Sequence, residues 1–275
     1  MQLMVSGAGL KTVAAAGVLA AAVGGAVIAR ADDSSGRAAQ AEGGLALSTS
    51  TGSTGSTLKV DRVAQAGATD TLKVANNSKK ALTVTVAARP WTQSASGVVS
   101  PNRRATLGGV SVSEPSFALA PGASKDVTVT LGSVPAAGYL YGALEVIGVP
   151  ADIAKTKGIV TGYRLLDTLR YNAATATYGL KAGAAKLSGT GTSRALVLSV
   201  KNTGNTIAPV TGKVTLKSAL GTKNGTLKAT RILPGKSVSL ALATASSLKA
   251  GKYTATVTLT QNKQKTTLTK KITVR

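Results

Sequence analysis

Cationic and aromatic side chains gather in one polar stretch in the first half of the chain. Arg89 and Trp91 stand at its start, and the adjacent pair Arg103 and Arg104 lies within the connection formed by residues 92–109. Guanidinium groups pair with carboxylates and phosphates, and an indole ring adds a large apolar contact face. These four residues are therefore candidate contacts to a polyanion or a glycan. The alternative is that Trp91 covers the core and the arginines are ordinary surface residues.

Basic residues are also concentrated in the last third of the chain, where acidic residues are absent. No Asp or Glu follows Asp167, whereas residues 181–275 contain 17 lysines and arginines. A surface of one sign attracts polyanions and raises their local concentration. The alternative is that these lysines form solvated strand faces. The candidate contacts in this region are Lys213, Lys217, Lys228, Lys263, Lys265, Lys270 and Lys271.

The side chains that most enzyme chemistry needs are missing. The sequence has no cysteine and no histidine, which excludes disulfides, thiolate nucleophiles, His-based triads and the commonest zinc ligand. Ten carboxylates remain, and the neighbouring set Glu114, Asp126 and Glu145 is expected to make surface ion pairs, not a glycosidase site. The sequence therefore predicts a protein that is not an enzyme and has no catalytic residues, cofactor or metal.

The N-terminal segment has the pattern of an export signal. Residues 12–29 form an uncharged run rich in Ala, Val and Gly, and Ala29-Arg30-Ala31 matches a cleavage site. We expect residues 1–31 to be a signal peptide; retention as an uncleaved anchor is the alternative. Residues 32–56, rich in Ser, Thr, Gly and Ala, are expected to be a disordered linker. The predicted location is secreted or extracellular, with cell-wall association as one form of it.

The remainder of the chain is patterned as short β-strands between turns. Apolar residues alternate with other residues along 82–88, 127–131 and 253–260, which is the period of a strand with one buried face. Strands at this spacing favour sandwiches over an α/β fold. We predict an all-β protein with two immunoglobulin-like β-sandwich domains in tandem, at residues 57–172 and 177–275, after the signal segment and flexible linker. The second domain is strongly basic.

Two landmarks indicate that the domains are related copies. Val74-Ala75-Asn76 recurs as Val200-Lys201-Asn202, and Pro121-Gly122 recurs as Pro234-Gly235. The offsets, 126 and 113 residues, differ by 13, so the first domain carries an insertion that we place at residues 92–109. Inserted loops on a rigid sandwich are common binding sites.

Three strands carry features with local consequences. Arg89-Pro90-Trp91 is expected to end a strand, because proline donates no hydrogen bond to a central ladder. Residues 159–171 are expected to form the last strand of the first domain. Lys270 falls in phase with apolar residues of the final strand, 266–274, which predicts a β-bulge or an edge strand.

The stretches LKVANNSKKALTVTV, RPW, VSEPSFALAPGASKDVTVTL and PAAGYLYGALEV, in this order, resemble the PapD-like branch of immunoglobulin-type domains. They are also similar to the extracellular domain of the WxL-interacting cell-surface proteins of Gram-positive bacteria. The resemblance covers about residues 57–171, and the second domain resembles generic immunoglobulin-like modules of bacterial surface proteins.

These resemblances imply two activities. Similarity to the WxL-interacting group implies binding of peptidoglycan or of a partner protein at the cell surface. Similarity to pilus chaperones implies donation of a strand to a subunit, which uses a paired Arg and Lys and a strictly alternating apolar strand. Residues 159–171 depart from that pattern, since Gly162 and Arg164 interrupt one face.

The favoured hypothesis is a secreted, non-enzymatic cell-surface protein that holds an anionic wall polymer, peptidoglycan or another exported protein. The alternative is a chaperone or subunit of a surface assembly that acts by β-strand addition at an exposed edge. Nucleic acid is not an expected partner, because the second domain offers only Tyr178 and Tyr253 for base stacking. No membrane-spanning segment is expected after removal of the signal.

Overall fold

The computed structural model describes residues 44–49, 59–190, 194–244 and 247–274. The predicted signal peptide and most of the predicted linker lie outside these residues. The described segments contain no helix that is both long and apolar enough to cross a membrane. They consist of β-strands, turns and one short 3₁₀ helix, Ile153–Lys155, so the predicted all-β class is confirmed.

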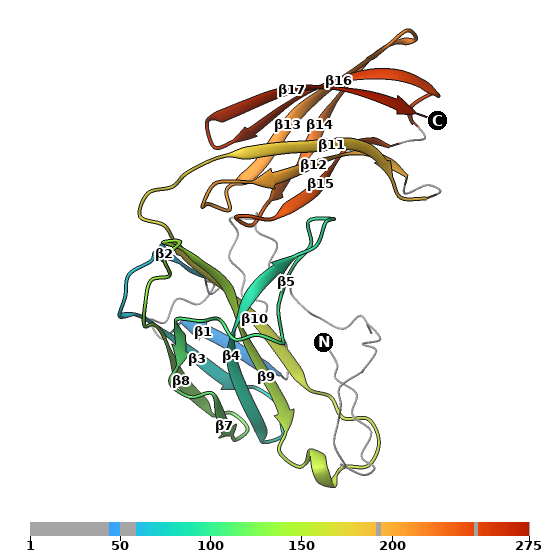
Figure 1. Ribbon diagram of the computed structural model, residues 1–275. Coiled ribbons are helices and arrows are strands. Elements are labelled where there is room, and N and C mark those ends of the chain that lie inside the picture. Colours follow the sequence, from blue (N-terminus) through green and yellow to red (C-terminus); the bar gives the residue numbers. More distant parts are fainter. Residues whose placement is uncertain (1–43, 50–58, 191–193, 245–246, 275) are drawn as a thin grey trace. The chain divides into compact units, whose positions relative to one another are not determined.

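The chain divides into two compact units, each of which is a β-sandwich with its own hydrophobic core (Figure 1). The first unit comprises Met1–Trp91 and Pro101–Asn172, and the second comprises Thr92–Ser100 and Ala173–Arg275. The predicted tandem of sandwiches is therefore confirmed. Part of the connection after Trp91 is grouped with the second unit, which the sequence does not indicate.

The first unit contains two sheets. One has four strands in the order β1-β3-β8-β6, and the other has the order β2-β10-β9-β4-β5, with β7 also paired to β4. β2 pairs in parallel with β10, while β9 lies antiparallel between β10 and β4. The strands are β1 (Leu45–Thr49), β2 (Lys59–Val63), β3 (Ala68–Asn76), β4 (Leu82–Gln93), β5 (Val99–Pro101), β6 (Val110–Val112), β7 (Ser116–Leu119), β8 (Ser124–Leu131), β9 (Leu140–Pro150) and β10 (Tyr163–Asn172).

The core of the first unit is formed by the inward side chains of both sheets. Every second residue is buried from Leu82 to Ala88 in β4 and from Val127 to Leu131 in β8, as the alternating sequence predicts. Each fully buried Val or Leu stabilises the fold by about 1.5–3 kcal/mol through loss of contact with water. The core includes Leu72, Val74, Leu82, Val84, Val86, Val127, Val129, Leu131, Leu144, Val146, Leu169 and Tyr171.

The predicted disordered linker, residues 32–56, is wrong for its segment Leu45–Thr49. This segment is β1, which pairs antiparallel with β3 from Leu45 opposite Asn76 to Thr49 opposite Leu72. Leu45 is 2% exposed, and Leu47 packs against the core. Two leucines spaced by one residue are enough to make a short strand where a sheet edge is available, despite the Ser- and Thr-rich surroundings.

The prediction that Arg89-Pro90-Trp91 ends a strand is also wrong. β4 continues through Pro90, which lies opposite Gly142 of β9, and ends at Gln93. The Pro90 carbonyl accepts a hydrogen bond from the Asn102 amide. The N–H and C=O of one residue point to the same side of a strand, so the missing N–H faces the β5 side and the ladder with β9 is intact.

The last strand of the first unit, β10, is shorter than the predicted 159–171. It starts at Tyr163, and a loop with the 3₁₀ helix precedes it. Arg164 does not interrupt the core-facing side, because it lies on the outer face with Leu166. The polar residue on the core-facing side is Asp167, which is 8% exposed and accepts a hydrogen bond from the Thr168 amide.

The second unit is a seven-stranded antiparallel sandwich, as in immunoglobulin-like folds. A three-stranded sheet has the order β11-β12-β15, and a four-stranded sheet has the order β14-β13-β16-β17. The strands are β11 (Leu180–Ser188), β12 (Ala195–Asn202), β13 (Pro209–Ser218), β14 (Gly221–Arg231), β15 (Ser237–Thr244), β16 (Gly251–Gln261) and β17 (Gln264–Val274). Its core includes Leu196, Leu198, Val200, Val214, Leu216, Ile232, Val238, Leu240, Val257 and Leu259.

The predicted edge position of the final strand is confirmed. β17 lies at the end of its sheet and pairs with β16 without a break in register. Lys270 stands opposite Ala255 and is half-buried on the core side, between the inward positions of Leu268 and Ile272. The edge position, and not a bulge, accommodates this inward lysine, because its long side chain can reach past the rim to water.

The internal repeat corresponds to a turn region that occurs once in each unit and is built around a buried asparagine, Asn76 or Asn202. We call this region the asparagine corner. Asn76 donates its side-chain amide to the carbonyls of Lys80 and Leu119, and its Oδ1 accepts the Ser78 amide. Its own carbonyl accepts the amide of Gly122, in the Pro121-Gly122 turn. Burial of this asparagine is complete because every polar group of its side chain is paired.

The second unit repeats these bonds at the expected offset. Asn202 donates to the carbonyls of Thr206 and Ile232, each at 2.7 Å, and accepts the Gly204 amide at 2.9 Å. The Asn202 carbonyl accepts the amide of Gly235. In both units the asparagine bonds the residues two and four positions later and one distant carbonyl, that of Leu119 or Ile232, so the repeat seen in the sequence corresponds to one structural arrangement.

Candidate binding surfaces

Three arginines converge on one buried carboxylate on the outer face of the larger sheet of the first unit. Glu145 lies in the middle of β9 and is 2% exposed. Its Oε1 accepts hydrogen bonds from Arg164 Nε at 2.6 Å and Arg103 Nε at 3.0 Å, and its Oε2 accepts one from Arg89 Nε at 3.4 Å. We call these four residues the Glu145 cluster. They come from β4, β9, β10 and the loop after β5.

The arginines keep Glu145 ionised. Burial raises the pKa of this carboxyl, but the hydrogen bond from Arg164 and the charges of Arg164, Arg103 and Arg89 outweigh it, and the net pKa lies below its ordinary value. Three guanidinium groups against one carboxylate leave an excess of positive charge. The Arg103 side chain is 40% exposed, so part of this excess faces solvent.

The structure brings together two of the four candidate residues predicted in this region. Arg89 and Arg103 both belong to the Glu145 cluster, whereas Arg104 is exposed and lies outside it. Trp91 is half-buried, and its Nε1 is buried with no hydrogen-bond acceptor among the described residues.

The expectation that Glu145 makes a surface ion pair is wrong. A surface pair does occur between Glu114 and Lys125 at 2.9 Å, with both side chains about two-fifths exposed. Glu145 differs because it sits within the apolar strand LYGALEVIGVP, where a carboxylate must be paired to be buried. The position of Glu145 within an apolar strand was the sequence signal that it would be buried and paired. Its partner Arg164 was not predicted, because that pairing depends on β10 lying beside β9.

Lysines and threonines cover the outer face of the four-stranded sheet of the second unit. The register places three rows across β13, β16 and β17, each of which contains only these two residue types. The rows are Lys217–Thr254–Lys271, Thr215–Thr256–Thr269 and Lys213–Thr258–Thr267. Thr211–Thr260–Lys265 adds a fourth row, and Lys252 lies opposite Thr273 at the far end. We call this surface the lysine–threonine face.

Five of the seven predicted lysines lie on this face or beside it. Lys213, Lys217, Lys265 and Lys271 are exposed on it, and Lys228 is exposed next to the irregularity in the β13–β14 pairing. Lys263 lies instead in the turn between β16 and β17. Lys270 points to the core side. Lys252 also lies on this face but was not among the predicted contacts, although its place in the strict alternation of residues 252–260 was a usable signal.

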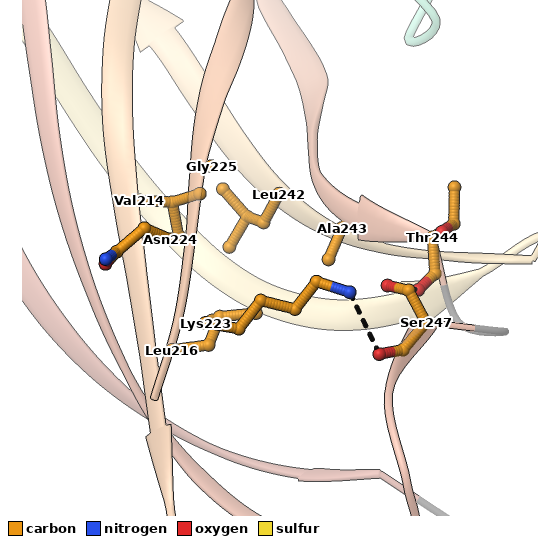
Figure 2. Close-up of a pocket in the computed structure, with 9 residues that line it drawn as sticks. All are labelled: Val214, Leu216, Lys223, Asn224, Gly225, Leu242, Ala243, Thr244 and Ser247. Carbon is orange, nitrogen blue, oxygen red and sulfur yellow. Dashed lines mark hydrogen bonds between the residues drawn. The ribbon is translucent and has the colours of Figure 1, made fainter. Parts of the chain in front are cut away.

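A cleft opens in the second unit between the edges of its two sheets (Figure 2). Its volume is about 230 Å³, and it lies between β14, β13 and the last residues of β15. Lys223 extends along the cleft, and its Nζ donates to the Ser247 carbonyl at 3.1 Å (Figure 2). The remaining lining is largely apolar and includes Val214, Leu216, Gly225, Leu242 and Ala243.

Gly225 leaves room for this cleft. A Cβ atom built at this position would lie 3.2 Å from Val214 Cγ1. Figure 2 shows Gly225 near both Val214 and Leu242. β14 and β15 are the outer strands of their sheets and pair on one side only, with β13 and β12 respectively. The cleft is therefore bounded by two strand edges of the kind that can accept an extended chain.

One extended segment already contacts an edge of the second unit. The segment Thr92–Ser100 belongs to this unit, and its Ala95 carbonyl accepts a hydrogen bond from the Ser239 amide of β15 at 2.7 Å. Gln93 donates to the Arg231 carbonyl at 2.7 Å and accepts from the Leu233 amide at 2.9 Å. The edge of β15 thus binds backbone through the Ser239 amide, and the Gln93 side chain binds the main chain at the end of β14 and just after it.

No protein-family model matches the sequence, and no curated protein matches it. Solved structures similar to the chain include one from a chaperone–tip adhesin complex of CFA/I fimbriae biogenesis, with 14% identity, a TM-score of 0.49, and coverage of 82% of this chain and 98% of that chain. The class 5 fimbriae chaperone CfaA has 16% identity and a TM-score of 0.47, with coverage of 82% and 99%. The E. coli chaperone DraB has 17% identity and a TM-score of 0.41, with coverage of 84% and 97%. The expected PapD-like resemblance is thus found again, as a likeness of fold alone.

Proposed function

We propose that the protein is an exported, non-enzymatic binding protein that holds an extended segment of another exported protein by β-strand addition. The segment would lie in the cleft of the second unit, against the edge of β15. The observation that carries this proposal is an apolar cleft bounded by two strand edges, one of which already binds the backbone of Ala95 through Ser239. This corresponds to the assembly-protein alternative of the sequence analysis.

The chemistry of the cleft favours a peptide over a small polar substrate. Main-chain hydrogen bonds at a strand edge supply affinity, and pockets for alternate side chains supply selectivity. Val214, Leu216 and Leu242 offer such a pocket for one or two apolar side chains. Lys223 adds a positive charge at the rim, which favours a segment with an acidic residue beside its apolar ones.

Export is supported by the sequence pattern of residues 1–31. The absence of histidine and cysteine from the sequence supports a binding role over an enzymatic one. The wall-polymer hypothesis concerns other residues, namely the candidate contacts in residues 89–104 and the candidate lysines of the second unit, and none of these candidates lines the cleft.

The test uses a heptapeptide of alternating valine and threonine with one terminal glutamate, and measures amide hydrogen exchange of the protein. We expect the peptide to slow exchange in Ala241–Thr244 of β15, because its backbone would pair with that edge. The same peptide with N-methylated backbone amides should give no protection. Equal protection by both peptides, or none by either, would overturn strand addition.

A matched pair of variants tests the location. Gly225→Val fills the cleft and should abolish the protection, because its side chain would enter the space beside Val214. Gly183→Val on β11 adds the same side chain to the other sheet, where a Cβ makes ordinary contact with Ser199 at 3.4 Å, and should leave protection unchanged. Protection that persists in Gly225→Val would place the peptide elsewhere.

A further inference from the structure

The lysine–threonine face has an unusual charge balance for a sheet surface. Its exposed lysines include Lys213, Lys217, Lys252, Lys265 and Lys271, and no acidic residue exists anywhere after Asp167 to neutralise them. Exposed sheet faces ordinarily alternate both signs, because like charges in neighbouring positions repel. The first unit follows that rule, with ion pairs such as Arg62–Asp70 and Lys125–Glu114.

Protection of strand edges does not account for these lysines. Lysine on an edge strand discourages pairing with another chain, and Lys265 and Lys271 on β17 can serve that purpose. Lys213 and Lys217, however, lie on β13, and Lys252 lies on β16, which are the two inner strands of the sheet. Lysine at an inner position guards no edge.

The register places the charges close enough to act together. Lys217 and Lys271 flank Thr254 in one row, two strand spacings apart, which is about 10 Å. Lys213 and Lys217 are four residues apart on the same strand, about 14 Å. These separations are similar to the Debye length of about 10 Å at 0.1 M salt, so the charges repel one another in the free protein. A bound polyanion would remove that repulsion.

The residue types on the face select among polyanions. Threonine hydroxyls lie between the lysines, and the Thr258 and Thr267 hydroxyls are 3.1 Å apart across the strands. Hydroxyls both donate and accept hydrogen bonds, which suits phosphate oxygens and polyol hydroxyls alike. The rows contain no aromatic side chain for stacking nucleic-acid bases and no arginine fork for bidentate pairing.

We propose that the lysine–threonine face binds a linear polyol phosphate, a polymer with regularly spaced phosphodiester charges and free hydroxyls. The lysine ammonium groups act as point charges and can pair with phosphates of a flexible ligand in many orientations. The threonine hydroxyls between them can hydrogen-bond the hydroxyls and phosphate oxygens of the polymer. Binding of this kind is independent of monomer sequence. It is driven by the release of counterions from the polymer, and it weakens as salt rises because that release then gains less free energy. The complementary charge of the face identifies the occupant, and the cleft takes no part in it.

The probe is poly(glycerol phosphate) on a biosensor surface, and affinity is measured over a salt series. We expect the triple variant Lys213→Gln, Lys217→Gln, Lys271→Gln to lose affinity roughly a hundredfold at low salt, which corresponds to about fivefold per lysine. Its dependence of affinity on salt should also become shallower. Absence of binding by the unaltered protein at low salt would overturn the proposal.

A charge-matched control separates the face from net charge. Lys181→Gln, Lys186→Gln, Lys201→Gln removes three exposed lysines from the other sheet, on β11 and β12, and should reduce affinity much less. An equal loss in both triple variants would overturn the assignment to the face. Competition by oligo-thymidylate as strong as that by poly(glycerol phosphate), at equal phosphate concentration, would overturn the selectivity for polyol phosphate.

Discussion

The two sandwiches share a core plan and a buried-asparagine corner but differ in how they treat charge. All ten acidic residues of the chain occur at or before Asp167, so no two side chains within residues 173–275 can form an ion pair with each other. In the first unit, the buried carboxylate of Glu145 pairs with three arginines that are themselves partly exposed. The second unit exposes its lysines without partners of opposite sign. Both units form the same kind of sandwich, so the alternating core and the asparagine corner do not depend on ion pairs. The charged residues of the second unit can therefore vary without loss of the fold and are available for binding.

The largest expected effect comes from removing the charge at the centre of the Glu145 cluster. Glu145→Gln leaves three guanidinium groups around a neutral, buried amide, and we expect the first unit to lose about 3–5 kcal/mol of stability. Fluorescence of the single Trp91, which belongs to that unit, reports the change in a urea titration.

The dependence of stability on pH is an independent test of the same cluster. The folded-state pKa of Glu145 is below its unfolded value, so its stabilisation is complete above that unfolded value and disappears as pH falls through the lowered pKa. Glu145→Gln should lack this part of the acid dependence. Glu114→Gln, which breaks an exposed pair, should cost less than about 1 kcal/mol. A Glu145→Gln protein as stable as Glu114→Gln would show that the cluster is not a stabilising centre.

The next largest effect tests whether the two corners are equivalent. Asn76→Ala and Asn202→Ala each remove two donated hydrogen bonds at a fully buried site, which leaves backbone carbonyls unpaired. Asn76→Ala also removes two accepted bonds, both from Ser78, and Asn202→Ala removes one, from Gly204. We expect each to cost about 2–4 kcal/mol. Asn76→Ala should shift the Trp91 fluorescence transition, and Asn202→Ala should speed hydrogen exchange of β12 and β13.

Surface asparagines supply the control for these corners. Asn224→Ala loses one exposed hydrogen bond with Thr215 and should change stability by less than about 0.5 kcal/mol. If Asn76→Ala were severe and Asn202→Ala mild, the two corners would share geometry without sharing their importance for stability.

Most of the fold could be predicted from local sequence patterns. Alternation along β4, β8 and β16 marks strands and their buried faces, and the two Pro-Gly turns mark the repeat. β1 was missed because its strand character comes from an available edge on β3, not from its own composition. The continuation through Pro90 was missed because the side to which a missing N–H points depends on the neighbouring strands.

The candidate sites could be predicted only where they are local. Lys213, Lys217 and Lys271 fall on one face because strict alternation places them there. The three arginines of the Glu145 cluster are 19, 42 and 56 positions away from Glu145 in the sequence, and no local sequence pattern predicts contacts at such separations. The cleft likewise depends on how the edges of β14 and β15 approach, which side-chain periodicity does not encode.

The smallest expected effect concerns Lys270, the one lysine of β17 that points towards the core side. Lys270→Val continues the apolar row of Leu268 and Ile272, so we expect stability to rise by about 0.5 kcal/mol. The same change removes an inward charge that discourages pairing of exposed edges, so the variant should self-associate in light scattering while the unaltered protein does not. Lys271→Val, on the outer face of the same strand, is the control and should gain less stability. A monomeric Lys270→Val protein would show that the edge is protected by its other lysines, and that the half-buried position of Lys270 serves no such purpose.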